Sequence, residues 1–387
     1  MRDAVIIEAV RTPTGKGKPG GALSGEHPVN LLARTLQTLV DRAGIDPGLI
    51  DDVIGGCVTQ VGDQSLNTTR NAVLAAGFPE SVPAMTVDRQ CGSSQQAAHI
   101  AAQGVMSGAY DIAIACGVES MSRVMMGSNV LPGTDPWGPA VAARYPDGLV
   151  GQGISAELIA ARWKITRSEQ DAFALLSHER ATNAWDSGHF GREVAWSGQR
   201  DETVRPSTTT EALAGLKPAY YDPRMEERFP EIGWTVSAGN SSPLTDGAAA
   251  VLIVEADVAR RLGLRPRARF HSFAVAGGDP LFMLTAIMPA TEKVLAKAGL
   301  AATDIDLFEV NEAFASVVLA WQRETDVDID RLNVRGGGIS VGHPLGGSGA
   351  RILTTLLHNL EDHDARYGLQ TMCEAGGMAN ALIVERI

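Results

Sequence analysis

The chain has few cysteines and few aromatic residues, and it lacks a long apolar run. Its 387 residues include four cysteines, and aromatic side chains make up 5%. None of the cysteines forms a Cys-x-x-Cys pair, so neither a disulfide scaffold nor a structural zinc site is expected. A membrane span needs about 18 consecutive apolar residues, and no stretch of the sequence comes near that length. Glu8 interrupts the apolar N-terminal segment, which argues against a signal peptide. We therefore expect a cytoplasmic protein without membrane insertion.

Basic residues are outnumbered by acidic ones. The chain carries 33 Lys and Arg against 45 Asp and Glu, a formal net charge of −12. Nucleic acids and anionic membranes bind clustered basic side chains, and no such cluster occurs in the sequence. Neither is expected as a partner. An anionic small molecule is not excluded, because it needs only a few local donors.

Hydrophobic residues make up 44% of the chain, enough for a large core. Short β-branched runs alternate with helical stretches, which is typical of an α/β protein. Residues 53–57, 112–116 and 249–254 are predicted as buried strands. The helix predicted over 95–106 is apolar on nearly every side, so it should be enclosed within the protein.

The chain resembles itself at a shift of 255 residues. Residues 43–45 then fall on residues 298–300, with Ala-Gly preserved. At the same shift, the loop and helix after Cys91 fall on the Gly-rich loop and helix after His343. We predict a duplication into two similar α/β halves. Their corresponding loops should meet at one cleft, where ligands of such sheets tend to bind.

The composition changes between residues 121 and 246. Five of the six tryptophans lie there, and Thr166 with Glu169 forms a capping-box pattern that predicts the start of a helix. This stretch is interpreted as an insertion that covers the cleft, with an unrelated surface excursion as the alternative. The expected partition is 1–120 plus 247–272 for the N-terminal half, 121–246 for the insertion, and 273–387 for the C-terminal half.

Cys91 lies where an apolar strand ends and the buried helix begins. The positive end of a helix dipole stabilises a thiolate and lowers its pKa below the free value of about 8.5. Cys91 is therefore the best candidate nucleophile in the sequence. A structural buried cysteine is the alternative interpretation.

His343 stands in the stretch 336–349, the richest in glycine. Glycines let the backbone approach a ligand closely. The stretch contains no complete dinucleotide-binding or P-loop pattern. A histidine held in such a rigid loop can serve as the general base toward a thiol.

Two further strand ends carry candidate residues. Asn311 follows a predicted strand and can hold a water or donate to an oxyanion, or else it caps a helix. Cys373 precedes a Gly turn, where a second thiol beside backbone amides can move a proton.

These motifs together resemble those of the thiolases, which cleave 3-ketoacyl-CoA with CoA or run the reverse condensation. Cys91-Gly-Ser-Ser, Asn311-Glu-Ala-Phe, Gly342-His-Pro-Leu-Gly and Cys373 before a Gly turn occur in the family's order. The likeness extends nearly end to end. It implies a duplicated five-layered α/β/α/β/α fold with a loop domain inserted in the N-terminal half.

The resemblance also implies roles for the matching residues. Cys91 becomes the acylated nucleophile, His343 takes its proton, and Cys373 is the second acid/base. Asn311 holds a water that, with His343, stabilises the thioester oxyanion, while the backbone amides of Cys91 and Ala375 form a second oxyanion site. CoA is a substrate, and no metal or redox cofactor is implied.

Further residues match the family's CoA contacts. Arg205 would approach the adenosine end, and the pantetheine tunnel would be lined by Tyr220, Ala238, Ser242, Met283, Ala313 and Phe314. Thiolases are dimers or tetramers, so the likeness also implies a homodimer or homotetramer.

Three departures from the family pattern affect the expected activity or substrate, and a Cβ in the oxyanion turn would reduce activity if that position needed a positive φ. Ala375 replaces a common glycine, Gly151-Gln152 stands where His-Met is common in biosynthetic members, and Ala286-Ile287 stands where Gly-Pro is frequent. The loss of that His and Met could open the acyl pocket. We expect a degradative thiolase of β-oxidation for acyl groups larger than acetoacetyl. The alternatives are a biosynthetic acetoacetyl-CoA thiolase, a non-catalytic acyl-CoA or lipid carrier, and a decarboxylating ketoacyl synthase.

Overall fold

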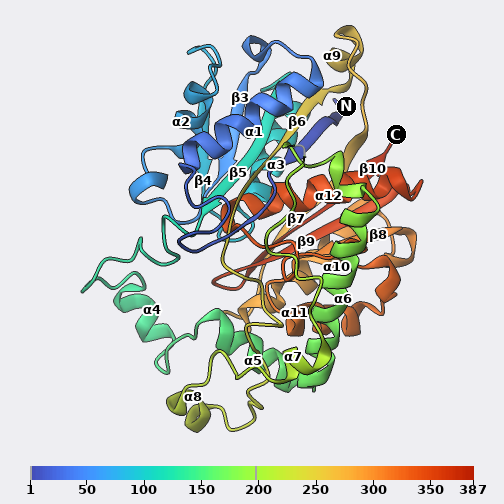
Figure 1. Ribbon diagram of the computed structural model, residues 1–387. Helices are drawn as coiled ribbons and strands as arrows, with labels where there is room; N and C mark the ends of the chain where they lie inside the picture. Colours follow the sequence, from blue (N-terminus) through green and yellow to red (C-terminus); the bar gives the residue numbers. More distant parts are fainter. Residues whose placement is uncertain (1, 197) are drawn as a thin grey trace.

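A layered α/β architecture is formed by residues 2–196 and 198–387, the part described by the computed structural model (Figure 1). The strands are β1 (Ala4–Arg11), β2 (Gly15–Lys16), β3 (Asp52–Gly56), β4 (Ala84–Val87), β5 (Ile112–Ser120), β6 (Thr245–Glu255), β7 (Ala268–Gly277), β8 (Leu307–Val310), β9 (Tyr367–Glu374) and β10 (Met378–Arg386). The helices are α1 (Pro28–Ala43), α2 (Thr68–Ala75), α3 (Ser93–Ser107), α4 (Gly138–Arg144), α5 (Gln152–Arg162), α6 (Arg167–Asp186), α7 (Thr210–Ala214), α8 (Pro223–Arg228), α9 (Ala256–Arg261), α10 (Ile287–Ala298), α11 (Ala315–Thr325) and α12 (Ser348–Asp362).

The two halves of the sheet have the same topology. The strand order is β4-β3-β5-β6-β1-β7-β10-β9-β8. In the first half β3 pairs in parallel with β5, and β6 pairs antiparallel with both β5 and β1. In the second half β8 pairs in parallel with β9, and β10 pairs antiparallel with both β9 and β7. A single bridge from Phe308 to Leu332 stands where the first half has β4.

The predicted shift of 255 residues is present in the structure. It carries α3 exactly onto the bounds of α12, and it carries the start of β3 and of β5 onto the starts of β8 and β9. The duplication is therefore confirmed at the level of elements.

Five layers result from this pairing. Helices α1 and α2 cover the outer face of the N-terminal strands, and α10 packs on the outer face of β7 and β10, with α11 in the same core. Between the two halves of the sheet lie α3 and α12, which contact each other (Figure 1). Ala97, Ala98, Ala101 and Ala102 of α3 are fully buried. The helix expected to be enclosed and the five-layered fold are both confirmed.

Strand β7 crosses the expected boundary between the N-terminal and C-terminal halves, which falls between residues 272 and 273. It pairs with β10 from Ala268 to Gly277, whereas it touches β1 only through Arg269 and Ala268. This register favours a division before β7 over one within it.

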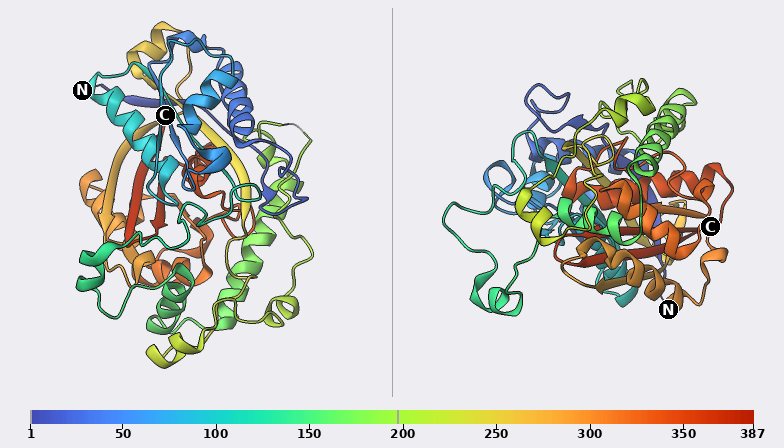
Figure 2. Two further views of the ribbon diagram at one scale, coloured as in Figure 1. Left: turned by 90° about the vertical axis from the view of Figure 1, so that its left-hand side faces the viewer. Right: turned by 90° about the horizontal axis from the view of Figure 1, so that it is seen from below.

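The insertion between β5 and β6 contains α4 to α8. Helices α5 and α6 pack against α11, while the segment with α4 projects from the body of the molecule (Figures 1 and 2). Thr166 and Glu169 form the predicted capping box at the start of α6. None of the helices in residues 2–196 and 198–387 is long and apolar enough to cross a membrane.

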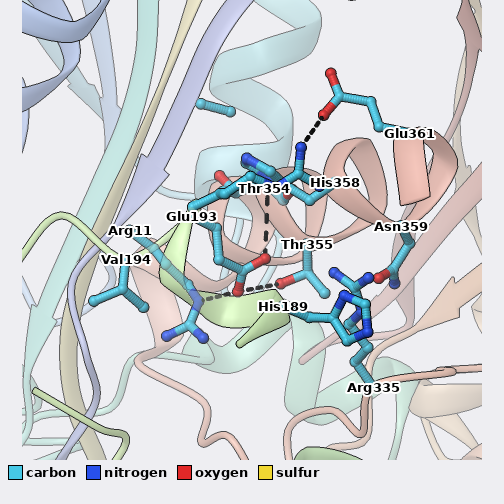
Figure 3. A network of polar contacts seen from close by, with 12 residues as sticks. Arg11, His189, Glu193, Val194, Arg335, Thr354, Thr355, His358, Asn359 and Glu361 are labelled. Atoms are coloured by element: carbon cyan, nitrogen blue, oxygen red, sulfur yellow. Dashed lines mark hydrogen bonds and ion pairs between the residues drawn. The ribbon is translucent and has the colours of Figure 1, made fainter. Parts of the chain in front are cut away.

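A buried ion pair fastens the middle of the insertion, after α6, to the core (Figure 3). The guanidinium of Arg11 on β1 pairs with Glu193, and it donates to both carboxylate oxygens of Asp201 at 2.8 and 3.0 Å. Thr355 of α12 donates to Glu193 at 3.2 Å. These contacts tie the returning chain to both the first strand and the central layer.

Candidate active site

A cavity of about 570 Å³ lies between the two halves and the insertion. Cys91 from the N-terminal half and His343 from the C-terminal half both line it. The other lining residues are Val58, Thr59, Gln90, Met121, Met126, Gly127, Asn129, Val130, Gly151, Gln152, Gly153, Ile154, Tyr220, Asp222, Ser242, Pro243, Leu244, Ala313, Phe314 and Leu345. The structure therefore brings together the predicted nucleophile and the predicted base.

Cys91 lies two residues before α3, in a turn that follows β4. Gln90 has a φ of 49°, which turns the chain sharply at this point. The thiol is free and 4% exposed. Burial, followed by the nearby carboxyl of Glu374, raises its pKa to about 12 against the opposing effects of Gln152 and of the residue's own N–H. The prediction of a thiol acidified by the helix terminus is thus wrong, because desolvation outweighs the dipole.

The hydrogen bonds of His343 define its tautomer. The hydroxyl of Ser348 donates to the carbonyl of Pro344 at 2.8 Å, so its oxygen accepts from His343 Nδ1–H at 2.6 Å. This leaves Nε2 with a lone pair, which faces the amide nitrogen of Asn311 at 3.4 Å. Burial and the charge of Arg351 lower the pKa of His343 to about 3. His343 is therefore a neutral acceptor in the resting site.

The loop that carries His343 is held at several points. Gly342 has a φ of 100°, and a Cβ there would come within 2.8 Å of the Thr245 side chain, so the position requires glycine. The N–H of His343 donates to Thr245 Oγ1 at 3.0 Å. Three residues later, Gly346 donates its N–H to the buried carboxylate of Glu119 at 2.9 Å. The imidazole therefore sits on a fixed backbone.

Asn311 is 1% exposed at the end of β8. Helix α11 begins at Ala315 with Phe314 as its N-cap, so Asn311 does not cap that helix. Its side-chain oxygen is buried without a hydrogen-bond partner. A buried acceptor of this kind is suited to hold an ordered water.

Cys373 and Ala375 lie at the end of β9. Cys373 is 1% exposed and does not line the cavity, but burial and the nearby Cys91 thiol both raise its pKa. The two thiols are thus close enough to interact. In residues 2–196 and 198–387, Ala375 is not one of the non-glycine residues that have a positive φ. Gly376 and Gly377, with φ of 82° and 80°, make the turn, so the departure at Ala375 creates no backbone strain.

The residues matched to CoA contacts fall into two groups. Tyr220, Ser242, Ala313 and Phe314 line the cavity, and the rings of Tyr220 and Phe314 meet edge to face at 5.8 Å. The remaining three, Arg205, Ala238 and Met283, are not among its lining residues. Arg205 and Ala238 are exposed, whereas Met283 is buried in the C-terminal core.

Four residues around the catalytic pair were missed as site residues by sequence reasoning: Gln152, Ser348, Glu119 and Glu374. Gln152 was noted as a departure from the family, and the structure places it beside Cys91. Ser348 lies in the Gly-rich motif itself. The two glutamates are separated by the internal shift of 255 residues, and that signal could have found them together.

The described residues contain no group of three or more His, Cys, Asp or Glu side chains that could hold a metal ion. The cavity itself offers the Cys91 thiol and the neutral imidazole of His343, and the Cys373 thiol and the Asn311 amide lie close behind its lining.

Comparison with known proteins identifies the family. The family model for the thiolase N-terminal domain matches residues 4–257, and that for the thiolase C-terminal domain matches residues 264–386. A steroid 3-ketoacyl-CoA thiolase of Mycobacterium tuberculosis is 46% identical, over 100% of this chain and 95% of its own length. A 3-ketoacyl-CoA thiolase of Citrobacter koseri is 43% identical over 100% of both.

The solved structures agree with the sequence relatives. The crystal structure of a Bacillus anthracis acetyl-CoA acetyltransferase superposes with a TM-score of 0.88 at 37% identity, covering 100% of this chain and 99% of that one. With family models matching both halves and relatives matching the full length, this chain belongs to the thiolase family of acyltransferases.

Proposed function

We propose that the chain cleaves 3-ketoacyl-CoA with CoA, giving acetyl-CoA and a shortened acyl-CoA through an acyl group on Cys91. One observation supports this above all others. Cys91 and His343 come from opposite halves and line the same cavity, and the imidazole presents an unprotonated Nε2 there. This is the arrangement that thiol attack on a carbonyl requires.

In the first step, the Cys91 sulfur attacks the 3-keto carbon while its proton passes to His343 Nε2. A resting thiolate is disfavoured, because burial raises the pKa of Cys91 and lowers that of His343. Proton transfer therefore accompanies the attack. The keto oxygen gains negative charge, which the N–H groups of Cys91 and Ala375 would stabilise. No acceptor among the described residues takes the Ala375 N–H, so it is free to donate.

In the second step, the bond between the α-carbon and the keto carbon breaks. The electron pair forms the enolate of acetyl-CoA, whose oxygen would be stabilised by His343 and by a water on Asn311. Cys373 would protonate the α-carbon. Cys373 then takes the proton of an incoming CoA thiol, whose sulfur attacks the acyl carbon and displaces the Cys91 sulfur, which recovers its proton from His343. Both buried thiols thus start and finish protonated.

The substrate is a 3-ketoacyl-CoA with an acyl group larger than acetoacetyl. Gly151 and Gln152 line the cavity at the positions where His and Met are common in the family's biosynthetic members. Apolar residues of the insertion, including Met126 and Val130, continue the same wall. The names of the relatives from M. tuberculosis and C. koseri point in the same direction, toward degradation of lipids.

CoA would lie under the insertion. Tyr220, Ser242, Ala313 and Phe314 provide the wall for its pantetheine arm. Arg205, Ala238 and Met283 remain proposed contacts farther along, with Arg205 at the adenosine end. We also propose a cytoplasmic homodimer or homotetramer that needs no metal or redox cofactor.

A thiolysis panel tests the proposal. We expect a higher kcat/KM for medium-chain, branched or cyclic 3-ketoacyl-CoAs than for acetoacetyl-CoA, and no activity in Cys91→Ala. Mass spectrometry of the wild type after substrate addition should show an acyl adduct on Cys91. Equal or better kcat/KM with acetoacetyl-CoA would instead identify a biosynthetic enzyme. The absence of any adduct would identify an acyl-CoA carrier.

A further inference from the structure

The duplication places one buried glutamate at the same point of each half. Glu119 near the end of β5 and Glu374 at the end of β9 are 255 residues apart, and both are fully buried. Each lies beneath a catalytic loop of the opposite half. Glu119 accepts from Gly346 in the His343 loop. Glu374 packs on Gly92, next to Cys91, so closely that a Cβ on Gly92 would lie 1.9 Å from its Oε1.

The two carboxyls differ in their partners. Glu119 accepts from the N–H groups of Val58, Thr59 and Gly346, and from the amide of Gln64, at 2.8 to 3.0 Å. Glu374 has one donor, because Asn380 reaches its Oε1 at 2.7 Å once the amide is oriented to satisfy both of its atoms. Its Oε2 is buried without a partner. An ionised carboxylate with so few donors is poorly stabilised.

We propose that Glu374 is a positioning residue for Cys91, because its buried carboxyl packs on the turn at Gly92 with its second oxygen unpartnered, and that its charge state changes the reactivity of Cys91. This inference rests on Cys91 being the nucleophile of the proposed function. Its basis is the contact of the Glu374 carboxyl with the turn at Gly92 and the lack of donors around its second oxygen.

The charges around Glu374 determine when it ionises. Burial raises its pKa to about 8, the carboxyl of Asp88 adds to the effect, and the guanidinium of Arg89 opposes it. On its own strand, Cys373 is a protonated thiol. Below about pH 8 the Glu374 carboxyl is therefore neutral and leaves Cys91 unaffected. Above it, the anion raises the pKa of the Cys91 thiol further.

The pH dependence of Cys91 alkylation tests this directly. Iodoacetamide is reacted with the substrate-free enzyme from about pH 6 to about pH 10, and the adduct on the Cys91 peptide is measured by mass spectrometry. In the wild type, the rate should rise less steeply above about pH 8 than a single titration predicts. In Glu374→Gln, the rise should continue, giving at least about threefold faster alkylation at the alkaline end.

Glu309→Gln is the matched control. Glu309 is also buried, and burial likewise raises its pKa to about 8, but it is not among the groups that shift Cys91. This variant should reproduce the wild-type profile. A Glu374→Gln profile that superposes on the wild type would overturn the proposal, and so would an equal shift in both variants.

If Glu374→Gln fails to fold, the wild-type profile still tests the proposal. A wild-type alkylation rate that follows a single titration over the whole pH range would contradict it. The outcome is independent of thiolysis. An enzyme that alkylates as expected but cleaves no 3-ketoacyl-CoA would refute the proposed function and retain the role of Glu374.

Discussion

At the scale of single residues, the site stores its reactive groups in uncharged form. Cys91 keeps its proton and His343 lacks one, although the two line the same cavity. Forming a thiolate and an imidazolium in a buried site is costly until negative charge moves on to a substrate oxygen. In the proposed mechanism, substrate binding rather than a preformed ion pair would activate Cys91.

Ser348 is expected to determine which ring nitrogen of His343 accepts a proton. Its oxygen fixes Nδ1 as the protonated nitrogen, so Ser348→Ala should let the imidazole occupy both tautomers. The loss of one buried hydrogen bond of about 1.5 kcal/mol predicts a fall of about tenfold in kcat, with little change in KM. Steady-state thiolysis kinetics measure both parameters.

Thr354→Ala is the control for Ser348→Ala. Thr354 is also a buried hydroxyl of α12, but it donates to the carbonyl of Ala350 and does not contact His343. Its removal should leave kcat within about twofold of the wild type. If both variants lose activity equally, the effect of Ser348 comes from the helix and not from the tautomer.

At the scale of elements, the ends of strands and the loops that follow them build the site. Glu119 near the end of β5 accepts hydrogen bonds from the N–H groups of Val58 and Thr59 after β3. It also accepts one from the N–H of Gly346 in the other half. One carboxylate thereby fixes two loops that line the cavity through Val58, Thr59 and His343.

Glu119→Gln should loosen both loops at once. An amide NH₂ in place of a carboxylate oxygen faces donors, which predicts a loss of about 1 to 3 kcal/mol in the free energy of unfolding and a fall of about tenfold in kcat. Urea unfolding and thiolysis measure the two effects. Glu157→Gln is matched, because Glu157 is buried and accepts from the N–H groups of Thr235 and Val236 away from the cavity. It should lose stability while retaining kcat. Wild-type kcat in Glu119→Gln would contradict the assigned role.

Sequence reasoning predicted the elements better than it predicted the environment of the site. The shift of 255 residues locates α3 and α12, because a duplicated fold keeps its element lengths. Which residues share the cavity depends on how the insertion folds back, so the exposure of Arg205 and the burial of Met283 were not predictable from local motifs. The pKa of Cys91 was predicted in the wrong direction, since burial is a property of the tertiary structure.

At the scale of the whole molecule, the catalytic pair depends on the two halves holding a fixed relation. Cys91 precedes α3 and His343 precedes α12, and these two helices pack on each other between the sheets. The central apolar core draws residues from both helices and from the strands of both halves. A displacement of one helix would therefore separate the nucleophile from the base.

Leu353→Ala tests whether the halves form one cooperative unit. Leu353 is a fully buried residue of α12 in the central core, and its truncation should cost about 2 to 5 kcal/mol of stability. Because that core is shared, hydrogen exchange should show equal loss of protection in β5 of one half and β9 of the other. Leu262→Ala, at a position 43% exposed, should leave both unchanged. Loss confined to β9 would mean that the halves unfold separately, and the alignment of Cys91 with His343 would then have to come from the ligand.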